Sequence, residues 1–205
     1  MTDVSLQEQR ATSPRRARLR PVVVAGRLTC ALVVLALAAG TVLWDDTYRS
    51  FEATGASLLV GHLVGGRAAV TDDIFWVYPG GFVHGFRVTS ECTAVLLVAP
   101  LLGLTAALFA FTRAPMWRLW LASGAMLAIV TAVNEFRLAF IAFASVRWGM
   151  HSGYDLAHVL IGSSIGIVGF AGGFVALLVI GLGRNRPRHL RLAHRRSGPS
   201  HEVLP

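Results

Sequence analysis

Residues 92–111 read CTAVLLVAPLLGLTAALFAF, a run without a single charged side chain. A stretch of this length and composition is typical of a helix that crosses a membrane. Three further apolar runs cover about residues 27–44, 119–146 and 156–182. The sequence therefore predicts an all-α membrane protein, a helical bundle of about four transmembrane helices, with four to six as the possible range.

The overall composition supports this class. Hydrophobic residues make up 54% of the chain and charged residues only 15%, with a mean hydropathy of +0.59. A typical soluble domain carries a much larger charged fraction. The first apolar run also lacks a convincing cleavage site, so we expect it to remain as a membrane helix.

The positive charge is concentrated at the two ends of the chain. The net charge is +8 at pH 7 and every basic residue other than histidine is arginine. The arginines cluster in residues 1–26 and 184–205, beside the first and last apolar runs. The positive-inside rule explains this pattern better than contacts with nucleic acid do. We therefore expect two disordered basic cytoplasmic tails around one transmembrane domain, residues 27–183, and no nucleic-acid partner.

Residues 45–91 differ from the rest of the chain because acidic side chains outnumber arginines. A short helix is predicted near residues 48–64, lying on the bilayer or dipping into it. Two extended pieces, 74–78 and 82–88, flank Pro79-Gly80-Gly81, a strong turn signal. This charge balance places the segment on the outer, extracytoplasmic side.

The run at 119–146 allows two interpretations, because Asn134, Glu135 and Arg137 interrupt it. Either one long tilted helix crosses once, or the chain breaks near Asn134 and residues 138–146 form a separate piece. We favour one crossing. A second crossing would put the basic C-terminal tail outside, and about nine residues are too few to span the bilayer.

This topology brings three reactive side chains to one membrane face. Cys92 opens the second span, and His158 lies in the first turn of the last. Arg137 lies about eighteen residues into the third run, roughly 27 Å at 1.5 Å per residue. Ionisable groups in membrane segments are costly and therefore usually functional.

Together the three residues suit thiol acyl-transfer chemistry. A cysteine attacks as its thiolate, which a helix N-terminus favours because free backbone N–H groups point towards the sulfur. His158 has the chemistry to accept and return the proton. Arg137 keeps its charge and is a natural donor to a developing oxyanion. Asp155, three residues before His158, is placed to orient the imidazole on the same helix face.

Each residue also has a structural interpretation. An arginine in the outer third of a helix can extend its guanidinium to the interface, and a histidine can bond a backbone carbonyl. Cys30, inside the first apolar run, is expected to be inert packing, and the two cysteines are not expected to form a disulfide. The agreement of Cys92, Arg137 and His158 in depth favours function.

The motifs around these residues resemble those of the exosortase/archaeosortase family. That family has a cysteine at the start of a membrane helix, then Asn-x-x-Arg, then a histidine in a later helix. The matching stretches here are Glu91-Cys92-Thr93-Ala94, Asn134-Glu135-Phe136-Arg137 and Asp155-Leu156-Ala157-His158. The resemblance covers roughly residues 45–183. Ala94 stands where the family often has glycine, and the chain is short for the family.

The resemblance implies a membrane cysteine protease-transpeptidase with Cys92, Arg137 and His158 as its catalytic set, supported by Asn134, Asp155 and Glu91. Its substrates would be exported proteins with a C-terminal sorting signal, cleaved at the outer face of the bacterial cytoplasmic membrane through a Cys92 thioester. A surface glycan or lipid would be the acceptor. The resemblance implies no cofactor and no metal.

Three other functions remain open. His151, Asp155 and His158 have the i, i+4, i+7 spacing of a Zn²⁺ site, although Ser152 and Gly153 read as a helix start. Glu135 with Arg137, Asp155 and His158 would suit a proton or ion path in a small transporter or accessory subunit, which would make Cys92 dispensable. The segment 162–166, with its two serines, is only a weak serine-protease signal.

Overall fold

The computed structural model describes residues 14–64, 66–150 and 152–183 of the chain. The elements follow in the order α1 (Pro14–Leu43), α2 (Asp45–Val64), β1 (Arg67–Thr71), β2 (Ile74–Tyr78), β3 (His84–Arg87), α3 (Val95–Phe111), α4 (Met116–Trp148), α5 (Ser152–Asp155), the π-helix η2 (Leu156–Gly162) and α6 (Ser163–Leu182).

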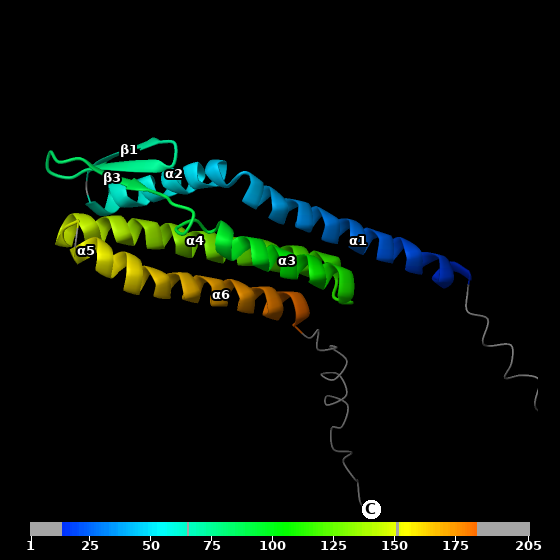
Figure 1. The fold of residues 1–205 in the computed structure, drawn as a ribbon. Coiled ribbons are helices and arrows are strands. Elements are labelled where there is room, and N and C mark those ends of the chain that lie inside the picture. The colour runs from blue at the N-terminus through cyan, green and yellow to red at the C-terminus, as the bar shows by residue number, and fades with distance from the viewer. Residues whose placement is uncertain (1–13, 65, 151, 184–205) are drawn as a thin grey trace, which may run out of the picture.

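Long helices form the body of the molecule (Figure 1). Three helical stretches of the described chain are long and apolar enough to cross a membrane: Pro21–Leu43, Met116–Trp148 and Gly153–Leu182. Val95–Phe111 is a shorter apolar helix beside them. The prediction of an all-α membrane bundle is confirmed, and the chain is an integral-membrane protein.

The first helix starts earlier than the sequence predicted. We expected residues 1–26 to be a disordered tail with Pro14 and Pro21 as breakers, but α1 begins at Pro14 and continues through Pro21. Proline is favourable in a first helical turn, and the Arg-rich, Leu- and Ala-containing segment between the two prolines has good helix propensity. The rest of the two expected tails, residues 1–13 and 184–205, lies outside the described residues.

A small antiparallel sheet in the order β1-β2-β3 packs on α2 at one end of the bundle (Figure 1). The extended pieces predicted at 74–78 and 82–88 correspond to β2 and β3. Strand β1 was missed because its side chains are mostly exposed and do not alternate. Phe75 and Phe86 face inwards from neighbouring strands with ring centroids 5.4 Å apart, so the sheet shares a core with α2 and α4.

Helix α4 is continuous from Met116 to Trp148, so the alternative with a break near Asn134 is wrong. Asparagine interrupts helices when its side chain competes for local backbone groups. Here the Asn134 amide instead donates to Glu52 and to the Cys92 carbonyl, both far away in the sequence. The tertiary partners therefore remove the local competition that the sequence suggested.

The glycines of α6 allow it to lie close against α4, as the sequence predicted. A Cβ added at Gly169 would lie 2.7 Å from Val133 Cγ1, and one at Gly173 would lie 2.6 Å from Val130 Cγ2. Both opposing side chains are β-branched and stiff. Close approach of backbones through small residues is a common way for membrane helices to associate.

We therefore expect Gly173→Ala to destabilise the protein by about 1–3 kcal/mol through overpacking. Gly124, on α4, is the matched control because a Cβ there would meet nothing within 4 Å. Gly124→Ala should be neutral or stabilising by about 0.5–1 kcal/mol, because alanine is the better helix former. Thermal unfolding in detergent measures both, and equal effects of the two substitutions would contradict this packing.

The last apolar run is not a single α-helix. Its start is the short helix α5 followed by the π-helical turn η2, and only from Ser163 does α6 continue as a regular α-helix. A Cβ at Gly162 would lie 2.7 Å from the Ala157 carbonyl oxygen, so glycine suits the end of the widened turn. π-Helical turns are rare and frequently occur at functional sites.

Candidate active site

Cys92 lies in a turn between the sheet and helix α3. Its backbone N–H donates to the Thr89 carbonyl at 2.9 Å, and α3 begins only at Val95. We predicted Cys92 at the helix N-terminus, and the structure places it just before the helix. The N–H of Ala94 donates to the Glu52 carboxylate at 2.8 Å, so it does not point freely at the sulfur.

The thiol of Cys92 meets the imidazole of His158 directly. Cys92 Sγ and His158 Nε2 lie 3.1 Å apart, although 66 residues separate them in the chain. His158 belongs to the π-helical turn, and its ring stacks on Tyr154 with centroids 5.1 Å apart and planes 11° apart. Cys92 is 5% exposed. A half-buried imidazole held by an aromatic ring is therefore fixed against a buried thiol.

Arg137 reaches the site through Asn134. Asn134 Nδ2 donates to the Cys92 carbonyl at 3.2 Å, and Asn134 Oδ1 accepts from Arg137 at 3.5 Å. The guanidinium is buried against η2, where a Cβ at Gly162 would lie 3.4 Å from Arg137 Nε. Within the described residues this Nε has no hydrogen-bond partner. A buried guanidinium with an unused donor has capacity for a further acceptor.

A cavity of about 270 Å³ opens above the thiol and imidazole. Gly85, Phe86, Arg87 and Thr89 form the wall on the side of β3. The opposite wall comes from α4, with Leu138 and Ile141, and from the segment Met150, Tyr154 and His158. The cavity is therefore bounded by apolar side chains, the edge of a strand and the reactive pair. Arg137 is not among its lining residues.

Glu52 is a buried carboxylate that the sequence analysis missed. It is fully buried, and its Oε1 accepts from both the Ala94 N–H and the Asn134 amide at 2.8 Å. The carboxylate thus ties α2 to the turn after Cys92 and to α4. A helical signal was present in the sequence, since Glu52 shares the spacing of the buried residues Ala56 and Val60. We had assigned the helix to the membrane surface and did not look for a buried face.

The pKa of Glu52 bears on folding. Burial raises the pKa of its carboxyl above the ordinary value, and the hydrogen bonds from Ala94, Thr93 and Asn134 act in the opposite direction. A raised pKa in the folded state means that the carboxyl contributes its stability below the ordinary pKa. That contribution is lost as the pH rises through the folded value.

We expect Glu52→Ala to lower the free energy of unfolding by about 1–3 kcal/mol, because two buried donors lose their acceptor. Glu52→Gln keeps an acceptor oxygen for both donors and cannot ionise. It should therefore stay folded. Its stability should also fall less than that of the unaltered protein as the pH rises above about 4.5. Thermal unfolding of the three proteins across pH measures this. Equal damage from alanine and glutamine would contradict the assigned role.

Two expected supporting residues lie differently from the prediction. Asp155 is exposed, and among the described residues it makes no hydrogen bond or ion pair with His158. The widened π turn explains this, since a three-residue spacing no longer puts two side chains on one face.

Glu91, the second of these residues, is exposed. A hydrogen bond from Thr89 lowers the pKa of Glu91, and the charge that His158 can carry acts in the same direction.

The arrangement also bears on the rival functions. His151 lies outside the described residues, and the rest of the described chain holds no group of three His, Cys, Asp or Glu arranged as a metal site. Glu135 faces α2, where its carboxylate lies against Gly55, whereas Arg137 faces the opposite neighbour η2. The acids and bases proposed for an ion path thus diverge. Ser164 is exposed and its hydroxyl donates to the Leu160 carbonyl.

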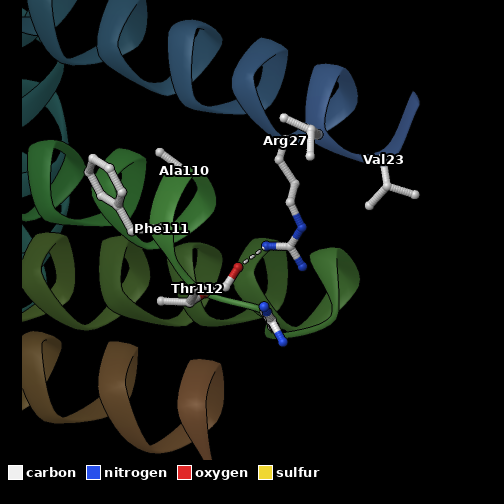
Figure 2. Close-up of a pocket in the computed structure, with 7 residues that line it drawn as sticks. Val23, Arg27, Ala110, Phe111 and Thr112 are labelled. Carbon is white, nitrogen blue, oxygen red and sulfur yellow. Dashed lines mark hydrogen bonds between the residues drawn. The ribbon is translucent and has the colours of Figure 1, made fainter. Parts of the chain in front are cut away.

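Another cavity, of about 650 Å³, is lined by residues of α1 and of the end of α3. These helix ends lie at the other end of the bundle from the sheet (Figure 1). Figure 2 shows Arg27 of α1 reaching towards Thr112, at the end of α3. Arg27 donates to the carbonyls of Phe109, Thr112 and Ala114, so its charge caps the helix C-terminus. Among the described residues, the lining of this cavity contains arginines but no thiol, imidazole or carboxylate. Cys30 is partly exposed on α1 and packs in the core cluster of α3, apart from Cys92.

Fold and site together define an integral-membrane protein in which a small sheet covers a paired thiol and imidazole. The family model described as transmembrane exosortase matches residues 24–180. The chain therefore belongs to the exosortase family. No curated protein and no solved structure shows a significant match to it.

Proposed function

We propose that this exosortase-family protein is a cysteine protease-transpeptidase that cleaves C-terminal sorting signals of exported proteins. The observation that carries the proposal is the 3.1 Å contact between Cys92 Sγ and His158 Nε2. A nucleophile within hydrogen-bond reach of its base is the arrangement that covalent catalysis needs. The family membership supports the same chemistry.

In the proposed reaction, His158 Nε2 takes the proton of Cys92 as the sulfur attacks the carbonyl carbon of the scissile peptide. The resulting oxyanion is stabilised by the positive charge of Arg137, which Asn134 holds beside the Cys92 backbone. His158 returns the proton to the leaving amine, and the peptide bond breaks to leave a thioester on Cys92.

An acceptor nucleophile then completes the cycle. Its amine or hydroxyl attacks the thioester carbonyl and gives its proton to His158, and the thiol of Cys92 is released with that proton. Transfer to a glycan or lipid acceptor gives transpeptidation, and transfer to water gives hydrolysis. The arrangement of acid, base and nucleophile is the same in both.

We place this reaction on the outer face of a bacterial cytoplasmic membrane, with both termini in the cytoplasm. The acid-rich segment 45–91 supports this orientation, because it carries the sheet that covers the thiol. The arginines at both ends of the chain support it through the positive-inside rule. Substrates with a membrane helix and a basic end would then align their cleavage site with Cys92.

The thioester gives the proposal a direct test. The purified protein is incubated with a reporter substrate, an exported protein that is encoded beside it and ends in a membrane helix and an Arg-rich segment. The mixture is then quenched in acid. We expect peptide mass spectrometry to find an acyl group on Cys92 that neutral hydroxylamine removes, with none on Cys30. Cleavage of the substrate without acylated Cys92, or unaffected by Cys92→Ala, would contradict the proposal.

A further inference from the structure

The free edge of the small sheet lies against the cavity of the candidate active site. Strand β3 pairs only with β2, in the register Phe75↔Phe86 and Ile74↔Arg87. The Val88 N–H donates to the Asp73 carbonyl at 2.8 Å, which makes that pair hydrogen-bonded. Because hydrogen-bonded pairs alternate along an antiparallel ladder, Phe86 also directs its backbone groups to β2.

By the same alternation, the backbone N–H and C=O groups of Gly85 and Arg87 point away from β2. Within the described residues these N–H and C=O groups make no backbone hydrogen bond on that side. Both residues line the cavity that contains Cys92 and His158. Unpaired edge groups are a template for another strand, and proteins usually cover such edges. Here the edge borders a cavity with a reactive thiol instead.

The geometry points to an extended polypeptide as the occupant of this edge. We propose that the substrate binds as an additional strand on β3, with its backbone paired to Gly85 and Arg87 and its scissile bond at Cys92. The inference rests on the proposed function and specifies how that site recognises its substrate. A strand added at the usual spacing lies about 4.8 Å from β3, on the side where the cavity opens.

The surroundings of the edge support a peptide as the ligand. A Cβ at Gly85 would lie 2.6 Å from the Trp76 ring, so Trp76 lies across Gly85 and covers one face of the strand. Phe86 fills the other face. With both faces occupied, the backbone edge is the part of β3 left to bind. Main-chain pairing supplies affinity in strand addition, and neighbouring side-chain pockets supply selectivity.

The first test removes one backbone donor. Arg87→Pro deletes an N–H at the free edge, where proline is tolerated in a sheet. We expect KM for the reporter substrate to rise about fivefold, with kcat within about twofold, since one hydrogen bond to the substrate is lost. Arg87→Ala removes the guanidinium but keeps the backbone N–H, so it measures the effect of losing the side chain alone. Its rise in KM should be smaller.

A matched control sits on the opposite edge of the same sheet. Ala68, in β1, pairs with Val77 of β2. By the same alternation its N–H points to the outer edge, away from the cavity. Ala68→Pro should therefore leave KM unchanged. Equal KM values for Arg87→Pro and Ala68→Pro, or for Arg87→Pro and Arg87→Ala, would overturn the inference. The rate of Cys92 alkylation by a small thiol reagent confirms that each variant keeps its site.

A second measurement uses the unaltered enzyme with synthetic peptides of the reporter's sorting segment, each N-methylated at one backbone amide. Strand pairing predicts losses of about fivefold at alternate positions and little effect between them. Uniform losses or none would overturn the inference while leaving Cys92-dependent cleavage intact. Absence of any Cys92-dependent cleavage would instead overturn the proposed function, and this inference with it.

Discussion

Replacing Cys92 by alanine is expected to abolish processing of an exported reporter, with a fall in rate on the order of 10³-fold or more. The thiol is the only nucleophile among the described residues that lies within hydrogen-bond reach of His158, at 3.1 Å. Without it no thioester forms, and the imidazole has no proton to accept. Immunoblotting of reporter cleavage in cells that produce each variant measures the effect.

Cys30→Ala is the control for this loss, because Cys30 packs on α1 against the core cluster of α3. It should process the reporter at the rate of the unaltered protein. Cys92→Ser is a second variant that keeps the size of the side chain but is much less readily ionised. Processing that survives Cys92→Ala would favour a transporter or accessory subunit, in which the thiol is dispensable.

The second large effect is expected at Arg137. Arg137→Lys keeps a positive charge but replaces the planar fork of donors by a single ammonium. The buried Nε that has no partner in the described residues is lost, and with it a donor that is free for a further acceptor. We expect kcat to fall about 10²- to 10³-fold with little change in KM, as for removal of an oxyanion donor.

Arg147→Lys is the matched control, since Arg147 is on the same helix but exposed in its last turn. It should leave both kinetic constants unchanged. Thermal unfolding separates chemistry from folding, because a structural role for Arg137 would lower the unfolding temperature in proportion to the loss of activity. A fully active Arg137→Lys protein would contradict the role in catalysis.

The bundle could be predicted from the sequence because each apolar run is long and its charges are few. The continuity of α4 was harder to foresee. Asn134, Glu135 and Arg137 read as an interruption, and only tertiary partners such as Glu52 show why the helix continues. Side-chain bonds between segments 82 residues apart have no local sequence signal.

The proximity of Cys92 and His158 was predictable from the sequence, and the geometry around them was less so. Cys92 and His158 were expected at one membrane face, and the structure brings them into contact. In the described part of the chain, Arg137 is connected to Cys92 only through Asn134, which forms hydrogen bonds with both residues. The π-helical turn around His158 has no sequence pattern that we could recognise, so Asp155 was wrongly placed beside the imidazole.

The central claim is that His158 activates Cys92. It is tested most directly by the rate at which a membrane-impermeant thiol reagent alkylates Cys92 in intact cells, measured across pH in a Cys30→Ser background. We predict that Cys92 is labelled faster than an ordinary thiol at neutral pH, and more slowly after His158→Ala. Slow labelling that follows the pH dependence of a free thiol, and that is the same with and without His158, would contradict the account.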